Sequence, residues 1–314
     1  MRSVAAAVAA VVSGMLLAGC GSGPSQVGAA AIVGDTAIPI EYVQAWWDRV
    51  LSDDRLKEQL RANEQFDDLG RVIAREAVRH ELLRQVAKRE GLQFDEAQIS
   101  DLIAALGGEQ AAVEITQSIY DRNTIRDRAR DQLLAVALAR KYFDTSLRFD
   151  MTVAANREQA VTKAHQLAAA DSNGARSIIQ ADINRGLPAA ADRKQSIADS
   201  VDAVLQTPLF AVPAGTVLAY PNPDQAGQGQ WIVVVVRERS KGTPSGRPGA
   251  VTADKVDESR LEGIGLRLLG PYSREIGVRL SPRYGVWSHE YVAVGETESE
   301  IPAIVVPIAT PVAS

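Results

Sequence analysis

The chain of 314 residues contains only one cysteine, Cys20, and three histidines, His80, His165 and His289. A single thiol excludes an internal disulfide and a cluster of cysteine metal ligands. The small number of histidines argues against metal chemistry as well. We therefore expect no metal and no cofactor.

The sequence also lacks an excess of positive charge. It has 34 Lys and Arg residues against 39 Asp and Glu residues, a net charge of -5. Nucleic-acid binding depends on cationic contacts to phosphate, so we expect no nucleic-acid partner. The length allows two ordinary globular domains, and 46% of the residues are hydrophobic, which excludes a disordered chain.

Long apolar runs are missing beyond the N-terminus. Arg2 precedes an apolar stretch, Val4 to Leu17, which is too short for a free-standing transmembrane helix but has the length of the apolar region of a signal peptide. It ends in Leu17-Ala18-Gly19-Cys20, which resembles the lipobox of bacterial lipoproteins. We predict a signal peptide over 1–19 and lipidation of Cys20, and the alternative is a secretory signal with a chance cysteine.

The short segment after the lipobox supports the same interpretation. Residues 20–28 are rich in Gly, Ser and Pro and show no periodicity, which predicts a flexible tether. Acyl chains on Cys20 would attach the protein firmly to a membrane. The predicted location is the cell membrane of a bacterial envelope, with the protein lipid-anchored on the extracytoplasmic face.

The first half of the remaining chain has the pattern of a helical domain. Ala31 to Ile38 predicts a two-stranded hairpin around Gly34-Asp35. Apolar residues then recur at helical spacing in four segments. These predict helices over 39–52, with Tyr42, Val43, Trp46, Trp47, Val50 and Leu51, over 66–89, with Val72, Leu83 and Val86, over 99–106, and over 124–143.

The second half mixes helices with strands. Residues 158–170 and 175–183 predict helices, and residues 216–220 and 231–237 predict strands, the latter β-branched almost throughout. Residues 241–255 predict a linker that begins with a Pro- and Gly-rich stretch. A further helix from Val256, with Leu261, Ile264 and Leu268 on one face, is expected to end before Pro271. Residues 293–314 are expected to be a flexible tail.

Several of these segments resemble known chaperone domains. Ala31 to Ile38, followed at once by a helix with Tyr42 and Val43, resembles the opening of SurA-type domains. Thr207–Phe210, Val212–Val217 and Gly229–Val236 resemble the back half of a parvulin prolyl isomerase. The last segment, Leu280–Trp287, resembles the strand with which SurA-like chains rejoin the N-terminal hairpin.

The order of these segments resembles a SurA/PrsA-like extracytoplasmic chaperone lipoprotein. This resemblance implies an α+β fold with a mainly helical SurA-like domain. Residues 29–148 and the C-terminal helix and strand at 256–292 would together form that domain. A parvulin-like α+β domain at 149–240 would be inserted between them.

The inserted domain departs from the parvulin pattern at its expected active site. Parvulins line their pocket with two histidines, one on the closing strand after a glycine and one on the first strand. Here Gly229-Gln230 is followed by Trp231, and Phe149–Ala154 contains no histidine. From this departure we predict that the domain is degenerate and that the protein is not an enzyme. The alternative is an active prolyl isomerase, of the EC 5.2.1.8 class, with a non-standard pocket.

Other catalytic patterns are absent or have simpler explanations. No Gly-x-Ser-x-Gly elbow of a hydrolase occurs. His80 is best explained as a hydrogen-bonded structural residue, and His165 as a surface residue. Asp53-Asp54 and Asp67-Asp68 lack the ligand spacing of a calcium loop and fit solvated helix ends.

The predicted function is a membrane-anchored extracytoplasmic chaperone or protein-binding module that holds unfolded or secreted polypeptides without catalysis. Trp46 and Trp47 point about 100° apart in a helix, so either one indole reaches a groove or both pack in the core. The other open alternatives are an adaptor for one folded envelope protein and a solute-binding lipoprotein. The predicted client-binding residues are Trp46, Trp47, Val72, Leu83, Val86, Leu261 and Leu268.

Overall fold

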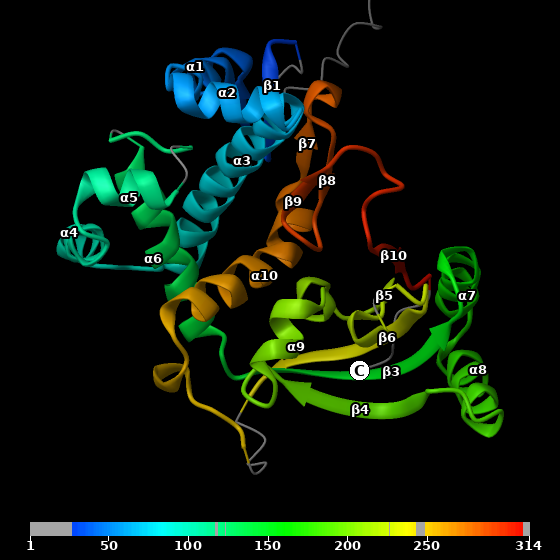
Figure 1. The fold of residues 1–314 in the computed structure, drawn as a ribbon. Coiled ribbons are helices and arrows are strands. Elements are labelled where there is room, and N and C mark those ends of the chain that lie inside the picture. The colour runs from blue at the N-terminus through cyan, green and yellow to red at the C-terminus, as the bar shows by residue number, and fades with distance from the viewer. Residues whose placement is uncertain (1–26, 117–118, 123, 226, 243–248, 310–314) are drawn as a thin grey trace, which may run out of the picture.

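The structure is a computed structural model that describes residues 27–116, 119–122, 124–225, 227–242 and 249–309. The predicted signal peptide, Cys20 and nearly all of the predicted tether lie outside these residues, as does the middle of the predicted linker. Among the described helices, none is long and apolar enough to cross a membrane. The fold is α+β, as predicted (Figure 1).

A short hairpin and one C-terminal strand form the first sheet, in the order β2-β1-β7. β1 (Ala29–Val33) and β2 (Thr36–Pro39) turn at Gly34, whose φ of 58° lies in the left-handed region that glycine adopts without strain. β7 (Val278–Leu280) pairs with the other edge of β1. The N-terminal hairpin therefore pairs with a strand that lies about 240 residues later in the chain.

The strand that joins the hairpin lies mostly earlier than predicted. Of the predicted segment Leu280–Trp287, Leu280 pairs with β1, whereas the residues from Pro282 on do not. A 3-10 turn, η4 (Pro282–Tyr284), bends the chain away from β1. The chain continues as β8 (Val286–Ser288), which pairs with β9 (Ala293–Gly295) instead. Gly285, with φ of 104°, is required in this bend because a Cβ there would lie 2.2 Å from the Gly295 carbonyl oxygen.

The helical domain has long helices with distinct ends. Asp53 and Asp95 cap two of its helices by accepting hydrogen bonds from backbone N–H groups, and Gly91 ends the longest helix with a positive φ. The helices before the second domain are α1 (Ile40–Val50), α2 (Asp54–Ala62), α3 (Phe66–Glu90), α4 (Glu96–Ala105), α5 (Glu109–Ile115) and α6 (Ile125–Lys141).

The last helix, α10 (Glu258–Ile276), continues through Pro271, where the sequence predicted its end. A proline inside a helix costs about 3 kcal/mol. Packing on both sides of Pro271 offsets this cost, since Leu268, Leu269 and Ser273 are at most 2% exposed. The helix is preceded by η3 (Ala253–Lys255).

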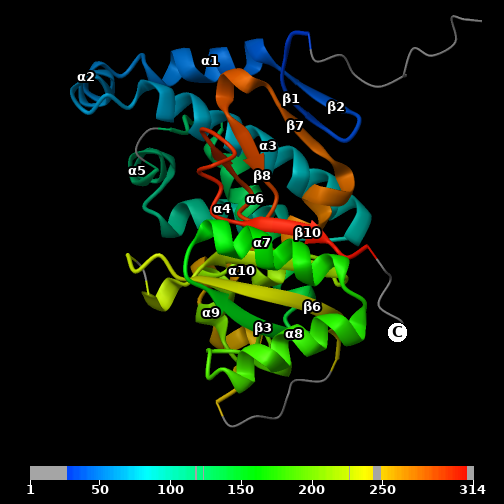
Figure 2. The ribbon, with the colours of Figure 1, turned by 90° about the vertical axis from the view of Figure 1, so that its right-hand side faces the viewer.

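The second domain is a five-stranded antiparallel sheet in the order β10-β5-β6-β3-β4. In Figure 2, α7 and α8 lie in front of β6 and β3. The 3-10 helix η1 and helix α9 precede β5 and contact α10 on the opposite side. The elements are β3 (Thr145–Ala154), α7 (Arg157–Ala169), α8 (Ser172–Asn184), β4 (Ala190–Ser196), α9 (Val201–Gln206), η1 (Leu209–Ala211), β5 (Thr216–Pro221), η2 (Pro223–Gln225), β6 (Trp231–Lys241) and β10 (Ile304–Pro307).

The C-terminal segment is folded over most of its described length, which corrects the prediction of a flexible tail over 293–314. β9 pairs with β8, and β10 pairs with β5 as an edge strand. Apolar side chains from residues 303 to 308 pack against both faces of the second domain, which explains why the segment is ordered.

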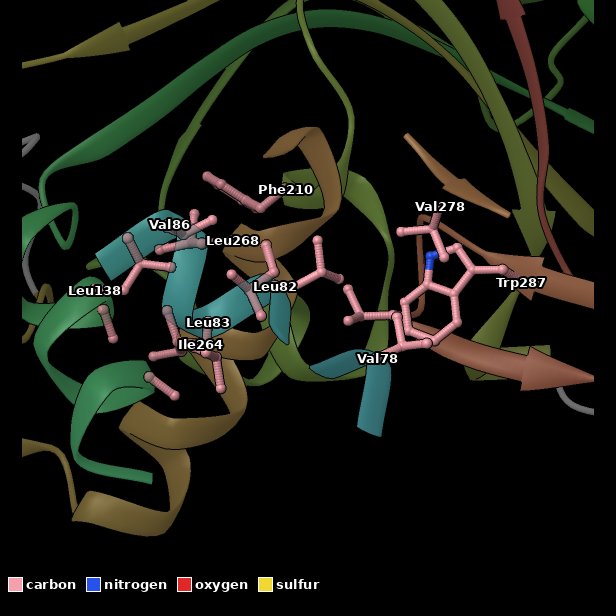
Figure 3. Packing of buried hydrophobic residues seen from close by; sticks show 14 of the residues in the cluster. Val78, Leu82, Leu83, Val86, Leu138, Phe210, Ile264, Leu268, Val278 and Trp287 are labelled. Carbon is pink, nitrogen blue, oxygen red and sulfur yellow. The ribbon is translucent and has the colours of Figure 1, made fainter. Parts of the chain in front are cut away.

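One large apolar core connects the two domains. It contains residues of α3, α6 and α10 together with η1 and one face of the five-stranded sheet. Figure 3 shows part of this core, in which Leu82 and Val86 of α3 lie near Leu268 of α10 and Phe210 of η1. A second cluster fills the space between the other sheet face and α7, and a third lies between α4 and α6.

Candidate functional site

Five of the seven predicted client-binding residues are buried in the core. Leu83 also lines the cavity described next, whereas the other four line none of the cavities described below, so their assignment to a client surface was wrong. Each of the five is at most 4% exposed, because the apolar stripe of an amphipathic helix packs inward. The five are Trp46, Leu83, Val86, Leu261 and Leu268. Trp47 and Val72 are only partly buried, and each lines a cavity.

A cavity of about 280 Å³ lies where three of the predicted elements converge. We call it the α3–α10 cavity. α3, α6, α10 and the segment after α5 form its walls. Its lining residues are Val72, Arg75, Glu76, Arg79, Leu83, Thr116, Ile119, Tyr120, Arg128, Asp131, Glu262 and Leu266.

The apolar part of this cavity comes from four side chains on different elements, Val72, Leu83, Ile119 and Leu266. Trp46 supports it from α1. The indole Nε1 of Trp46 donates a hydrogen bond of 2.6 Å to the Ile119 carbonyl oxygen, and its ring packs on Tyr120 with centroids 5.4 Å apart. The helix with the tryptophan pair therefore shapes the cavity, although Trp46 itself does not line it.

Glu76 is the central charged group of the cavity. It forms ion pairs with Arg75 at 2.8 Å and Arg79 at 3.2 Å, and it accepts a hydrogen bond of 2.9 Å from the Tyr120 hydroxyl. Burial would raise the pKa of Glu76, but the charges of Arg79 and Arg75 outweigh this and lower its pKa below the ordinary value. Burial and the Glu76 charge together raise the pKa of Tyr120. At neutral pH the carboxylate is charged and the phenol is neutral.

Two further contacts join α10 and the C-terminal segment to the cavity. Arg128 on α6 pairs with Glu262 on α10 at 2.6 Å. Arg79 Nε donates a hydrogen bond of 2.8 Å to the Val292 carbonyl oxygen. Three guanidinium groups thus line the cavity with the carboxyl groups of Glu76, Glu262 and Asp131. Because the positive and negative groups are equal in number, the cavity does not favour a ligand of one charge. It offers hydrogen-bond donors and acceptors next to an apolar surface.

His80 lies beside the cavity and has a structural partner, as predicted. Its Nδ1 is 3.0 Å from both carboxylate oxygens of Asp131 on α6. The hydrogen bond to Asp131 raises the pKa of His80 above its ordinary value, although burial opposes the shift. The pair joins α3 to α6.

A second cavity, of about 300 Å³, surrounds Trp47. The Trp47 ring stacks on Phe66 with centroids 6.5 Å apart. It also lies against Gly70 on α3, where a Cβ would be 2.8 Å from Trp47 Cζ3, so no larger residue fits there without a shift. Tyr284 and Arg283 line the other side. Of the tryptophan pair, one indole is in the core and one reaches a groove, which was one of the two predicted arrangements.

The three histidines of the chain do not meet. His80 is on α3 and His165 is exposed on α7. His289 is hydrogen-bonded to Ser273 Oγ of α10 at 2.9 Å. On the two strands where the parvulin resemblance implies histidines, β6 carries Trp231 after Gly229-Gln230, buried against α7, and β3 contains no histidine. Asp150 of β3 pairs with Arg237 of β6 at 2.6 Å.

The second domain has its own cavity, of about 710 Å³, at the end of β3 and the start of α7. Its lining includes Lys163, Arg185 and Gln230 and no histidine. Lys163 Nζ pairs at 2.7 Å with Asp182, which is fully buried and also accepts a hydrogen bond of 2.5 Å from Thr152. This network joins α7, α8 and β3. In the described part of the chain no group of three or more His, Cys, Asp or Glu residues could hold a metal ion.

Sequence reasoning missed the charged lining of the α3–α10 cavity. Arg75, Glu76 and Arg79 lie between the apolar residues of α3, and the sequence analysis assigned no role to them. A signal was present, because Arg79 falls three positions after Glu76 and beside the apolar stripe. Glu262 carries no such signal, since its partner Arg128 is far away in the sequence.

Comparisons with known proteins find little. No family model matches the chain, and no curated protein matches it. Among solved structures, the foldase protein PrsA from Lactococcus lactis is 13% identical over 81% of this chain and 94% of that chain, with a TM-score of 0.29. PrsA from Streptococcus pneumoniae is 14% identical over 74% and 92%, with a TM-score of 0.23. At these values neither fold nor function is transferred.

Proposed function

We propose that this protein is an extracytoplasmic chaperone or protein-binding module that holds unfolded or secreted polypeptides without catalysis. The observation that carries the proposal is the α3–α10 cavity, which combines an apolar floor with charged side chains already held in place. The second cavity, around Trp47, adds an aromatic surface that a client side chain would contact.

The chemistry of the α3–α10 cavity suits a polypeptide segment. An apolar side chain entering it would gain about 25 cal/mol per Å² of apolar surface removed from water. The guanidinium and carboxylate groups offer hydrogen bonds to backbone amides, whose donors and acceptors do not depend on sequence. At about 280 Å³ the cavity is at the small end of ligand sites, so it would take only a short stretch of a client.

The proposed location depends on the N-terminal sequence. Lipidation of Cys20 and the tether over residues 20–28 would hold the domains at the outer face of the membrane. Clients would then be polypeptides that have just crossed it. Mass spectrometry of the purified membrane form tests this part, because diacylation adds a defined mass to the peptide that begins at Cys20.

The proposed lack of catalysis depends on the second domain. Rotation about a prolyl bond must cross a barrier of about 20 kcal/mol, and an enzyme lowers it with polar groups aimed at the bond. The two strands on which the parvulin resemblance implies histidines contain none, and they carry the buried Trp231 and the Asp150–Arg237 pair instead. Both are already engaged, one in apolar packing and the other in a salt bridge.

Suppression of client aggregation tests the holding function. The chain without its signal peptide and lipid should suppress the aggregation of several unrelated denatured proteins without ATP. Leu266→Gln places a polar group in the floor of the α3–α10 cavity and should weaken this suppression at unchanged melting temperature. Leu106→Gln is the matched control, since Leu106 is 37% exposed and outside the residues that line the cavity. Equal loss in both variants would contradict the assignment of the site.

A refolding assay separates holding from catalysis. Proline-limited refolding takes tens of seconds or longer without an enzyme. We expect no acceleration at substoichiometric amounts of the protein, and acceleration would instead support an active isomerase. Proximity crosslinking in the native envelope should capture many unfolded chains. Capture of a single folded protein would favour an adaptor.

A further inference from the structure

The two edges of the five-stranded sheet are protected in different ways. At one edge, β4 carries Asp192, Arg193 and Lys194, all exposed, and Asp192 has a positive φ of 57° that disturbs the strand. Charges and irregularity prevent a further strand from pairing with such an edge. At the other edge, β5 is regular, apolar and buried from Thr216 to Tyr220. This edge is protected only because β10 covers it.

β10 binds to β5 as an extended peptide would bind. Residues Ile304 to Pro307 lie antiparallel to β5, with Val305 opposite Leu218. Beyond the strand, the Ile308 amide donates to the Gly215 carbonyl oxygen at 3.0 Å and the Ala309 amide to that of Ala168 at 3.2 Å. Backbone bonds of this kind do not depend on the side chains of the added strand.

The side chains of this segment alternate between two apolar surfaces. Ile304, Val306 and Ile308 pack on the cluster beneath α7, where Ala164 and Ala168 leave room for β-branched side chains. Ala303 and Val305 pack on the other side, against the main core. The site therefore accepts an extended chain with aliphatic residues at alternate positions.

β10 is attached to the sheet only loosely, although most of its residues are apolar. None of its residues is buried, and Pro307 is exposed. Pro302 lies two residues before the strand and Pro307 is its last residue, and neither has an N–H to donate to a neighbouring strand. In Figure 1 the chain from β9 to β10 leaves the helical domain as a loop and crosses to the sheet. The segment could therefore leave β5 without unfolding the rest of the molecule.

We propose that the β5 edge is a second binding site for extended, aliphatic client segments, and that β10 occupies it in the absence of a client. A client segment enters by replacing β10, whose sequence defines the chemistry that the edge accepts. The identity of the ligand as a client rests on the proposed function. The exchange of one strand for another does not.

The first experiment tests the exchange with a peptide of residues 301–309, labelled with a fluorophore. A chain of residues 24–300 should bind this peptide, as measured by fluorescence anisotropy. The chain of residues 24–314 should bind it at least about tenfold more weakly, because its own tail competes at a millimolar effective concentration. A peptide with Val306→Asp should not bind. A folded shortened chain that fails to bind the wild-type peptide would overturn the proposal.

The second experiment keeps the tail and locks it in place. Leu218→Cys with Val305→Cys places two thiols directly opposite each other on adjacent strands, and the natural Cys20 is absent from residues 24–314. Facing positions of an antiparallel pair lie about 4.5–5.5 Å apart, which suits a disulfide. The oxidised and reduced forms carry the same substitutions, so any loss of core packing cancels in their comparison.

The reduced form should bind the labelled peptide and suppress client aggregation better than the oxidised form. Equal peptide binding in both forms would overturn the proposal. If the redox state changes peptide binding but neither form suppresses aggregation, strand exchange stands and the proposed holding function fails. If the reduced form gives dimers that bind no peptide, strand exchange between two copies replaces the proposal.

Discussion

Two C-terminal segments complete the two domains, and they do so with different strength. α10 joins the helical domain through side chains that are at most 2% exposed, among them Leu261, Ile264 and Leu268. β10 joins the sheet of the second domain with no fully buried residue. The comparison indicates that α10 is part of the helical fold, whereas β10 is an attachment that the second domain can lose.

The difference follows from how closely each segment approaches its partner. α10 crosses α6 at Gly265, where a Cβ would lie 1.9 Å from the Ala135 carbonyl oxygen, and meets η1 at Gly270. At both glycines the backbone of α10 contacts the backbone of its neighbour directly, and no larger residue fits there. β10 adds one short ladder to one free edge, and water can replace each of its backbone bonds.

The largest expected effect is the loss of folding in Gly265→Ala. The new methyl group would overlap Ala135 backbone atoms that cannot move without displacing α6. We expect destabilisation of more than about 4 kcal/mol, or no cooperative unfolding transition at all. Urea denaturation followed by circular dichroism measures it.

Gly263→Ala in the same helix is the matched control. Its nearest neighbour is Leu205 Cδ2 at 2.6 Å, the end of a flexible side chain that can rotate away. Alanine also has the higher helix propensity, by about 1 kcal/mol. A stability close to that of the wild type is expected, and a loss as large as in Gly265→Ala would show that helix crossing is not the cause.

The next effect in size compares one apolar side chain from each segment. Leu268→Ala should cost about 2–5 kcal/mol, as deletions in a packed core do. Val306→Ala should cost about 1 kcal/mol or less, since half-buried methyl groups lose less on exposure. Both free energies come from the same denaturation experiment. Similar costs would remove the distinction between the two segments.

The same two segments show how much of the fold the sequence could predict. The helix from Val256 was recognisable because Leu261, Ile264 and Leu268 repeat at helical spacing, and only its end at Pro271 was wrong. β10 was missed because a strand of four residues that ends in a proline has no periodicity of its own. Its conformation depends on the free edge of β5, which is distant in sequence.

The candidate site was predictable only in part, for the same reason. The helices that form the α3–α10 cavity came from apolar periodicity. That pattern also selects the residues that pack inward, so it assigned Val86 and Leu261 to a client surface although they are fully buried. The polar lining depends on pairs such as Arg128 and Glu262, which only the tertiary structure brings together.

A smaller effect concerns the polar contact that holds α10 to the N-terminal helices. Glu90 at the end of α3 accepts hydrogen bonds from Lys141 Nζ at 2.8 Å, Tyr142 at 2.6 Å and Tyr272 of α10 at 2.7 Å. Burial would raise the pKa of Glu90, but these hydrogen bonds outweigh it and lower its pKa to about 2. The carboxylate therefore stabilises the fold above its ordinary pKa near 4.5, and this contribution disappears as the pH falls toward 2.

Glu90→Gln should lower the free energy of unfolding by about 1–3 kcal/mol at pH 7, as expected for a hydrogen-bonded charge that loses its partners. The difference from the wild type should shrink as the pH falls below 4.5. Glu58→Gln is the control, because the Glu58–Arg61 pair is 69% and 60% exposed and should contribute little. A difference that stays constant down to pH 3 would contradict the role of the Glu90 charge.

The smallest effect concerns two histidines on different elements, His80 on α3 and His289 in the C-terminal segment after α10. The hydrogen bond to Asp131 raises the pKa of His80, whereas burial and the Arg274 charge lower the pKa of His289. Stabilisation by His80 is complete below its ordinary pKa of 6.5 and is lost as the pH rises through the higher folded value. Stabilisation by His289 is complete above pH 6.5 and is lost as the pH falls through the lower pKa of the folded state.

His80→Gln should therefore reduce the free energy of unfolding at pH 6 and have less effect at pH 9. The reduction at pH 6 should be about 0.2–1 kcal/mol, because the His80–Asp131 pair is partly exposed. In His289→Gln, the loss of stability that the wild type shows below pH 6.5 should be absent. Denaturation from pH 5 to 9 measures both, and the same sign of pH dependence in the two variants would show that the imidazoles are not held as the structure places them.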